Sequence, residues 1–150
     1  MEHWEYLKPD GLRFVWDDTL FRPGTDSFLL SSLPKLSAGL RVCDLGCGTG
    51  LLGLLLLQRQ SELTVTGIDI QPAAVALAER AAAENRLTDR LTFQCIDLRQ
   101  VRQHFSTGSF DLVVCNPPYY PPASGKVSGD SARRTAFMAA KSVFTKSYGA

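Results

Sequence analysis

The chain alternates between short apolar runs and longer segments whose apolar residues recur at helical spacing. The apolar runs predict strands over residues 40–45, 63–68, 91–96 and 110–115. The segments between them predict helices over residues 51–58, 72–85 and 99–105. This alternation indicates an α/β fold with a mostly parallel sheet and helices on both faces. A further helix is expected over residues 131–145, and no fifth strand is expected after Tyr120.

The first 39 residues have a weaker pattern. Residues 12–16 alternate enough to predict a short edge strand, preceded by a turn over residues 9–11. A helix is expected over residues 27–34, with Asp26 as its N-cap. Two interpretations of residues 21–26 stay open: they form only that cap, or they form a flap over a ligand.

Polar groups lie at the carboxyl end of each of the four predicted strands of the sheet. They are Asp44 with the glycines after it, Asp69, Asp97 and Asn116. Parallel strands end at one edge of a sheet, and ligands of such folds bind there. Asp97 alone is equally compatible with a cap or a turn, but four polar strand ends in succession favour a binding site.

The fourth strand leads into Asn116-Pro117-Pro118-Tyr119. Proline fixes φ and removes N–H donors, and it keeps the preceding residue extended. The amide of Asn116 and the carbonyl of Pro117 can therefore face outward as acceptors beside the Tyr119 ring. Such a site suits a planar group that carries an NH2. The alternative is a rigid loop with a capping Asn.

The first strand runs into Gly46-Cys47-Gly48-Thr49-Gly50 and then into a helix, an arrangement typical of nucleotide-binding folds. A dinucleotide fingerprint requires a third glycine where Leu51 stands, and that reading leaves Asp44 unexplained. A carboxylate before the glycines suits a ligand with an ammonium or sulfonium end. No lysine follows the glycines, which excludes a P-loop.

Composition and charge narrow the class of protein. Apolar residues make up 45% of the 150 residues and charged residues 21%, enough for a core and unlike a disordered chain. The net charge of the whole chain, +1, does not by itself indicate that it binds nucleic acid. The four cysteines form no zinc pattern, so no metal is expected, and their usage favours a reducing compartment, the cytoplasm. No signal peptide or membrane span is expected.

The segment Asp44 to Gly50 resembles the first motif of S-adenosylmethionine-dependent methyltransferases with a Rossmann-like fold. The Asn116–Tyr119 segment resembles the motif of their amino-methylating branch, which acts on the exocyclic amine of adenine or on the side-chain amide of glutamine. Within that branch, residues 21–26 and 120–126 make the chain similar to the bacterial enzymes that methylate the N6 amine of the adenine next to the anticodon in a valine tRNA. The resemblance covers about residues 10–135.

The resemblance implies a role for each matching position. Asn116, Pro117 and Tyr119 would be catalytic. S-adenosylmethionine would be bound by residues on all four strand ends and in the N-terminal segment: Thr25, Asp44, Gly46, Cys47, Gly48, Gly50, Asp69, Ile70, Asp97, Leu98 and Asn116. Asp69 would hold the ribose hydroxyls, Asp97 would meet the adenine amine, and Asp44 would line the methionine end.

The chain departs from that family after the motif. The family's sheet has seven strands and four are expected here, so the chain resembles a truncated or frame-shifted product, with an exposed sheet edge through which copies could associate. We expect a flap and first helix over 1–39, a cofactor-binding core over 40–120, and an incomplete basic part over 121–150. That part has five basic residues against one acidic residue, Asp130, which suits either tRNA or solvent.

Three other functions stay open. Glutamine methylation of release factors is the first, although those enzymes have a sizeable helical domain where this chain has only about 40 residues. A non-catalytic fragment that binds S-adenosylmethionine or a partner's sheet edge is the second, favoured by the missing strands. A dehydrogenase is the third, and the misplaced third glycine counts against it.

Overall fold

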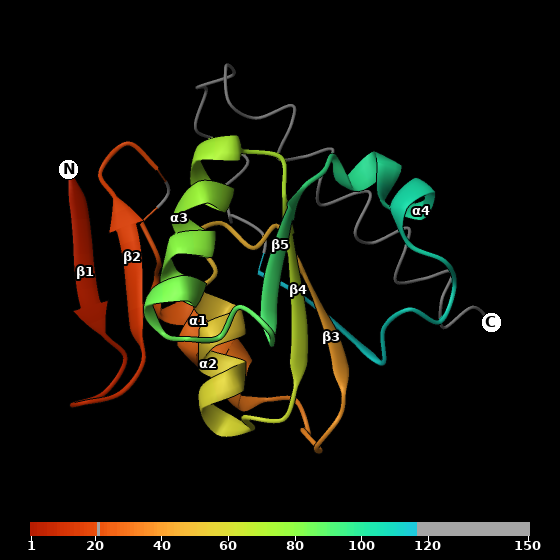
Figure 1. The fold of residues 1–150 in the computed structure, drawn as a ribbon, viewed down its shortest axis with the longest axis horizontal. Coiled ribbons are helices and arrows are strands. Elements are labelled where there is room, and N and C mark those ends of the chain that lie inside the picture. Colours follow the sequence, from red (N-terminus) through yellow and green to blue (C-terminus); the bar gives the residue numbers. More distant parts are fainter. Residues whose placement is uncertain (21, 117–150) are drawn as a thin grey trace, which may run out of the picture.

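A computed structural model of the chain describes residues 1–20 and 22–116. These residues form a two-stranded hairpin, followed by a four-stranded sheet with helices on both of its faces (Figure 1). The hairpin consists of β1 (Glu2–Tyr6) and β2 (Arg13–Asp17), which pair antiparallel. The helix predicted over 131–145 and the absence of a fifth strand after Tyr120 lie outside the described residues.

The main sheet has the strand order β5-β4-β3-β6, and every pair of neighbouring strands is parallel. Its strands are β3 (Arg41–Leu45), β4 (Thr64–Asp69), β5 (Leu91–Cys95) and β6 (Leu112–Cys115). The predicted α/β fold with a parallel sheet is therefore confirmed, and each predicted strand is found to within two residues.

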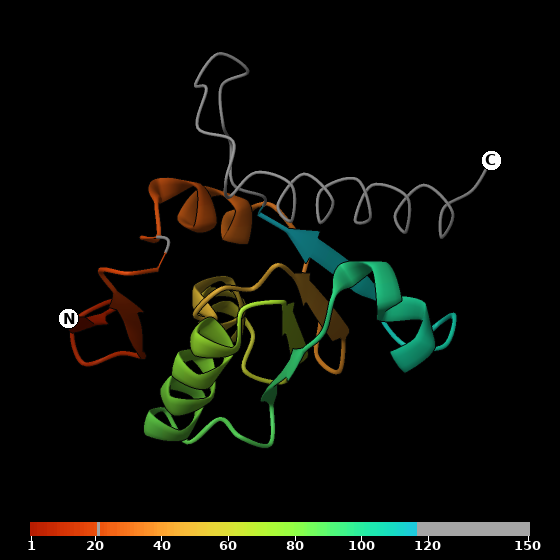
Figure 2. The same ribbon diagram turned by 90° about the horizontal axis from the view of Figure 1, so that it is seen from above.

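The helices divide between the two faces of the sheet (Figure 2). One face is covered by α2 (Leu51–Arg59) and α3 (Pro72–Glu84), with α1 (Thr25–Ser32) packed on α2. The short helices η1 (Leu98–Gln100) and α4 (Val101–His104) cover the other face. Side chains alternate along each strand, so Val42 and Asp44 point to the α2 face while Cys43 and Leu45 point to the α4 face.

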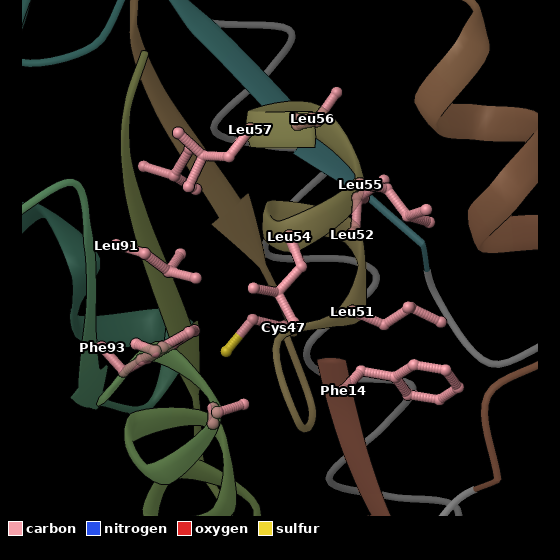
Figure 3. Close-up of a cluster of buried hydrophobic side chains, with 14 of the residues drawn as sticks. Phe14, Cys47, Leu51, Leu52, Leu54, Leu55, Leu56, Leu57, Leu91 and Phe93 are labelled. Atoms are coloured by element: carbon pink, nitrogen blue, oxygen red, sulfur yellow. The ribbon is translucent and has the colours of Figure 1, made fainter. Parts of the chain in front are cut away.

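The larger core lies between the sheet, α2, α3 and β2 (Figure 3). All seven residues from Leu51 to Leu57 are buried, because α2 is enclosed by the sheet, by α1 and by β2. A helix that is apolar all around is typical of such a position. Leu54 and Leu56 are fully buried, and each such side chain contributes about 1.5–3 kcal/mol to stability.

The N-terminal segment is joined to this core. Phe14, Val15 and Trp16 of β2 belong to the same apolar cluster as the sheet and α2. The side chain of Asn85, at the end of α3, accepts a hydrogen bond from the backbone N–H of Arg13 at 2.8 Å and donates to its carbonyl at 2.6 Å. The core therefore runs across the expected boundary between residues 39 and 40, and the division into three domains stays a prediction.

Two features of the N-terminal segment differ from expectation. The predicted N-cap is wrong, because α1 begins at Thr25 and Gly24 is its N-cap, with no side-chain capping bond. Because the helix begins at Thr25, Asp26 lies within the first helical turn, where a carboxylate interacts favourably with the helix dipole. Strand β1 was not predicted, since its apolar and charged residues do not alternate clearly. The predicted turn before β2 is confirmed by a hydrogen bond from the Gly11 N–H to the Lys8 carbonyl.

Candidate active site at the carboxyl ends of the strands

The carboxyl ends of the four parallel strands meet at one edge of the sheet. Asp44 is the penultimate residue of β3 and Asp69 is the last residue of β4. Asp97 follows β5 by two residues, and Asn116 directly follows β6. Neighbouring strands lie about 4.8 Å apart, so these polar groups form one row, as the sequence predicted.

The loop after β3 folds back against the end of β4. The N–H groups of Gly46 and Cys47 both donate to the carbonyl of Ile68, at 2.8 and 3.0 Å. Gly46 and Gly48 have φ angles of +70° and +55°, a backbone conformation that residues other than glycine rarely adopt. A Cβ atom placed on either glycine would have no described atom within 4 Å. The loop therefore offers open backbone that a ligand can approach closely.

Asp44 is a buried carboxylate beside this loop. Its side chain is 2% exposed, and neither oxygen has a hydrogen-bond partner among the described residues. Burial, with a smaller contribution from the nearby Asp69 carboxylate, raises the pKa of Asp44 to about 7. An unpaired buried carboxylate is unfavourable by itself, so a cation or hydrogen-bond donor brought to Asp44 would be bound strongly.

Asp69 connects the glycine loop to the start of α3. One carboxylate oxygen accepts a 2.8 Å hydrogen bond from the N–H of Gly48, and the other accepts a 2.9 Å bond from the N–H of Gln71. The side chain is 7% exposed. A carboxylate has about four acceptor positions, so two remain for donors from a ligand.

Asp97 makes only local contacts within the described residues. Its carboxylate caps η1 by accepting from the N–H of Arg99 at 2.9 Å, and it pairs with the Arg99 guanidinium. The Arg99 hydrogen bonds lower the pKa of Asp97. The capping role left open by the sequence is therefore present, and contact of Asp97 with a ligand stays a prediction.

Asn116 is half-buried and contacts the N-terminal segment. Its side-chain Nδ2 donates a 2.9 Å hydrogen bond to the hydroxyl of Ser27 in α1. Ser27 is 7% exposed and was not among the predicted site residues. Its position directly after Thr25-Asp26 was the available signal, but only the folded chain brings residues 27 and 116 together. Pro117 and Tyr119 lie outside the described residues.

The remaining predicted site residues differ in their surroundings. Thr25 is exposed at the start of α1, and Ile70 is 45% exposed directly after Asp69. Cys47 points into the larger core near Phe93 (Figure 3), and Leu98 belongs to the smaller core under α4. The structure therefore places Thr25 and Ile70 at the protein surface, while the side chains of Cys47 and Leu98 face away from solvent.

The four cysteines are free thiols, and burial raises the pKa of Cys43 and Cys115 to about 12. Within residues 1–20 and 22–116, no group of three or more His, Cys, Asp or Glu side chains is placed to hold a metal ion. No helix in this part of the chain is long and apolar enough to cross a membrane.

The chain belongs to the methyltransferase small domain family, whose sequence profile matches residues 15–147. Among its relatives, the tRNA1(Val) (adenine(37)-N6)-methyltransferase of Enterobacter sp. (strain 638) is 34% identical over 122 residues, which are 77% of this chain and 49% of that protein. The enzyme of the same name from Serratia proteamaculans is 35% identical over 108 residues, 71% of this chain and 41% of that protein. The chain spans about half the length of the curated relatives it matches.

Solved structures agree with this assignment of the fold. A geranyl diphosphate methyltransferase in complex with GPP and sinefungin superposes with a TM-score of 0.56 at 21% identity, over 65% of this chain and 36% of that one. A SAM-dependent methyltransferase from Thiobacillus denitrificans in complex with S-adenosyl-L-homocysteine gives 0.53 at 25% identity, over 64% and 37%. The expected Rossmann-like methyltransferase fold is confirmed.

Proposed function

We propose that the protein is an S-adenosylmethionine-dependent N-methyltransferase that acts on the N6 amine of an adenine in tRNA, next to the anticodon of a valine tRNA. The observation that carries this proposal is the buried Asp44 carboxylate, which has no partner among the described residues and lies beside open glycine backbone. Relatives that are 34–35% identical to this chain carry the name of that activity.

The described residues fit S-adenosylmethionine. A carboxylate that needs a cation or donor suits the positively charged methionine end of the cofactor, and the open backbone at Gly46 and Gly48 admits a ligand at close range. We assign the ribose hydroxyls to the free acceptor positions of Asp69. Asp97 would accept from the adenine amine, which requires Arg99 to release one carboxylate oxygen.

The remaining cofactor contacts follow from exposure. Ile70, 45% exposed beside Asp69, offers an apolar surface for the purine. Thr25 would contact the cofactor from α1. Since the side chains of Cys47 and Leu98 are buried, we assign their contacts with the cofactor to their backbone groups. Gly50 ends the loop and would contribute its backbone in the same way.

The chain's own residues would position the target nitrogen. The Oδ1 atom of Asn116 and the carbonyl of Pro117 would accept hydrogen bonds from the adenine NH2, and Tyr119 would stack on a base that has left its stack. The bound cofactor supplies a methyl group on a positively charged sulfur. Fixing the nitrogen's lone pair toward that carbon accounts for much of the rate, and the two acceptors stabilise the positive charge that develops on nitrogen.

The first test is a calorimetric titration of S-adenosylmethionine into the 150-residue chain. Saturable binding that is lost in Asp69→Ala supports the cofactor site. Absence of binding to a well-folded chain would contradict it for this length of chain. The second test offers tRNA and a release factor with a methyl-labelled cofactor; label in the tRNA adenine supports the proposal, and label only in the protein's glutamine identifies the alternative activity.

Partners and location are part of the same proposal. The basic residues of 121–150 suit tRNA phosphates, and the four free thiols suit the cytoplasm, where thiols stay reduced. Among the described residues β6 is the last strand on its side of the sheet. We propose self-association through this edge, which predicts a dimer in sedimentation; a monomer at high concentration would contradict it.

A further inference from the structure

The side chain of Asn116 is held from the N-terminal segment. The 2.9 Å bond from its Nδ2 reaches the hydroxyl of Ser27, 89 residues earlier in the chain. The blue end of β6 points toward α1 in Figure 2, in agreement with this contact. On the basis of the proposed function, we propose that Ser27 is a positioning residue: it holds the Asn116 amide in the arrangement that leaves Oδ1 free for the substrate.

An asparagine amide has two ends of nearly the same shape but opposite hydrogen-bonding character. Only the oxygen can accept a hydrogen bond from an adenine NH2; the nitrogen would set two donors against each other. Rotation about the terminal torsion exchanges the two ends at little cost, and a serine hydroxyl can meet either end because it both donates and accepts. In this structure the Ser27 hydroxyl accepts from Nδ2. With Nδ2 bound to Ser27, Oδ1 is the end left for the substrate.

Ser27 can act as a fixed reference because α1 is anchored. Arg59, the last residue of α2, donates from its guanidinium to the carbonyl of Ser31 in the last turn of α1 and to that of Pro34, two residues after the helix. Helix α2 itself begins at the glycine loop. The anchoring of α1 therefore relates the position of Asn116 to the loop that we assign to the cofactor.

The matched control lies on the same helix. Ser31 is 5% exposed, one turn after Ser27, and its hydroxyl donates to the carbonyl of Phe28 at 2.7 Å. Ser31→Ala therefore removes a buried hydroxyl of the same kind without touching Asn116. Ser27→Thr keeps the hydroxyl and serves as the rescue variant.

The kinetic experiment measures methyl transfer to tRNA adenine by the wild-type chain, Ser27→Ala, Ser27→Thr and Ser31→Ala. We expect Ser27→Ala to lower kcat roughly tenfold to a hundredfold, the size of effect that misplaced reacting groups produce. The Kd for S-adenosylmethionine should stay within twofold of wild type. Ser27→Thr should recover most of kcat, and Ser31→Ala should change it little.

An NMR experiment tests the contact without relying on activity. In the wild-type chain we expect a nuclear Overhauser effect between the Asn116 NH2 protons and the Ser27 Hβ protons, with the NH2 signals identified by their loss in Asn116→Ala. Those signals should shift in Ser27→Ala and stay in place in Ser31→Ala. A missing Overhauser effect overturns the proposal even if Ser27→Ala does not fold.

The two experiments separate this inference from the proposed function. Wild-type chain that transfers no methyl group to RNA counts against the function, while the NMR result still decides whether Ser27 holds Asn116. A confirmed contact with unchanged kcat in Ser27→Ala overturns the positioning role. Equal losses in Ser27→Ala and Ser31→Ala attribute the effect to helix packing and also overturn it.

Discussion

Asp69 and Gly48 are joined by a 2.8 Å hydrogen bond, in which the carboxylate at the end of β4 accepts the backbone N–H of the loop that follows β3. The other carboxylate oxygen accepts the N–H of Gln71, the N-cap residue of α3. A single side chain thus holds the glycine loop and the start of a core helix in one arrangement. The loop's shape is therefore present before any ligand arrives.

Removing this carboxylate should destabilise the chain. In Asp69→Ala the N–H groups of Gly48 and Gln71 lose their acceptor, which is expected to lower the free energy of unfolding by about 1–3 kcal/mol. Urea unfolding followed by circular dichroism measures the loss. Asp89→Ala, at an exposed position, is the control. Equal midpoints for the two variants would contradict the role assigned to Asp69.

The pKa of Asp44 predicts how stability depends on pH. The pKa is about 7 in the folded chain and 3.8 for an ordinary aspartate, so between pH 4 and 7 the folded chain keeps a proton that the unfolded chain has lost. Stability from this group therefore falls as pH rises through that window, by about 1.4 kcal/mol per pH unit. Asp44→Asn lacks this slope. The stability of the variant relative to the wild type should therefore rise from pH 4.5 to pH 7. A constant difference would contradict the raised pKa.

Cofactor binding should show the opposite dependence on pH. A cationic ligand favours the ionised form of Asp44, so the affinity for S-adenosylmethionine should rise between pH 6 and 8, as the carboxyl group loses its proton. In Asp44→Asn the affinity should be lower and nearly constant over this range. Calorimetric titration at several pH values measures both curves, and parallel curves would argue against Asp44 as the group that faces the cation.

Asn116→Ala should separate binding from transfer. The variant loses the acceptor that we assign to the target amine and should transfer no measurable methyl group, because positioning supplies much of the rate. Its affinity for S-adenosylmethionine should stay close to that of the wild type. Gln94→Ala, an exposed substitution on β5 at the opposite end of the sheet, should leave both quantities unchanged. Parallel loss of binding and transfer in Asn116→Ala would contradict the assigned role.

The hairpin's attachment can be tested at Asn85. Asn85→Ala removes two hydrogen bonds to Arg13 and one to the carbonyl of Ala81, and is expected to destabilise the chain by about 2–3 kcal/mol. Glu84→Ala breaks only the exposed ion pair with Arg13 and should have a smaller effect. Both free energies come from urea unfolding. A larger loss in Glu84→Ala would show that the ion pair, and not the amide, attaches the hairpin.

The sequence predicted most of the sheet because its strands are short apolar runs that end in polar residues and glycine. Strand β1 was missed because Glu2 to Tyr6 has no clear apolar face, and its pairing depends on β2. The N-cap at Asp26 was wrong because Gly24, Thr25 and Asp26 are all acceptable near a helix start, and the pattern alone does not choose among them.

The candidate site was predictable where a polar side chain lies at the carboxyl end of a strand, as at Asp44, Asp69 and Asn116. The burial of Asp44 and the two backbone bonds of Asp69 depend on how the loop folds back, which residue spacing does not specify. Ser27 could not be found in this way, since its partner is 89 residues distant and their contact depends on how α1 packs.

The joining of β2 to α3 has a consequence for how this protein is made. Phe14, Val15 and Trp16 leave the ribosome well before the helices they pack against, since α2 begins at Leu51 and α3 at Pro72. During synthesis these apolar side chains are therefore exposed until the segments they pack against have been translated. A nascent chain of this protein should present them to a holding chaperone until α3 and Asn85 have emerged.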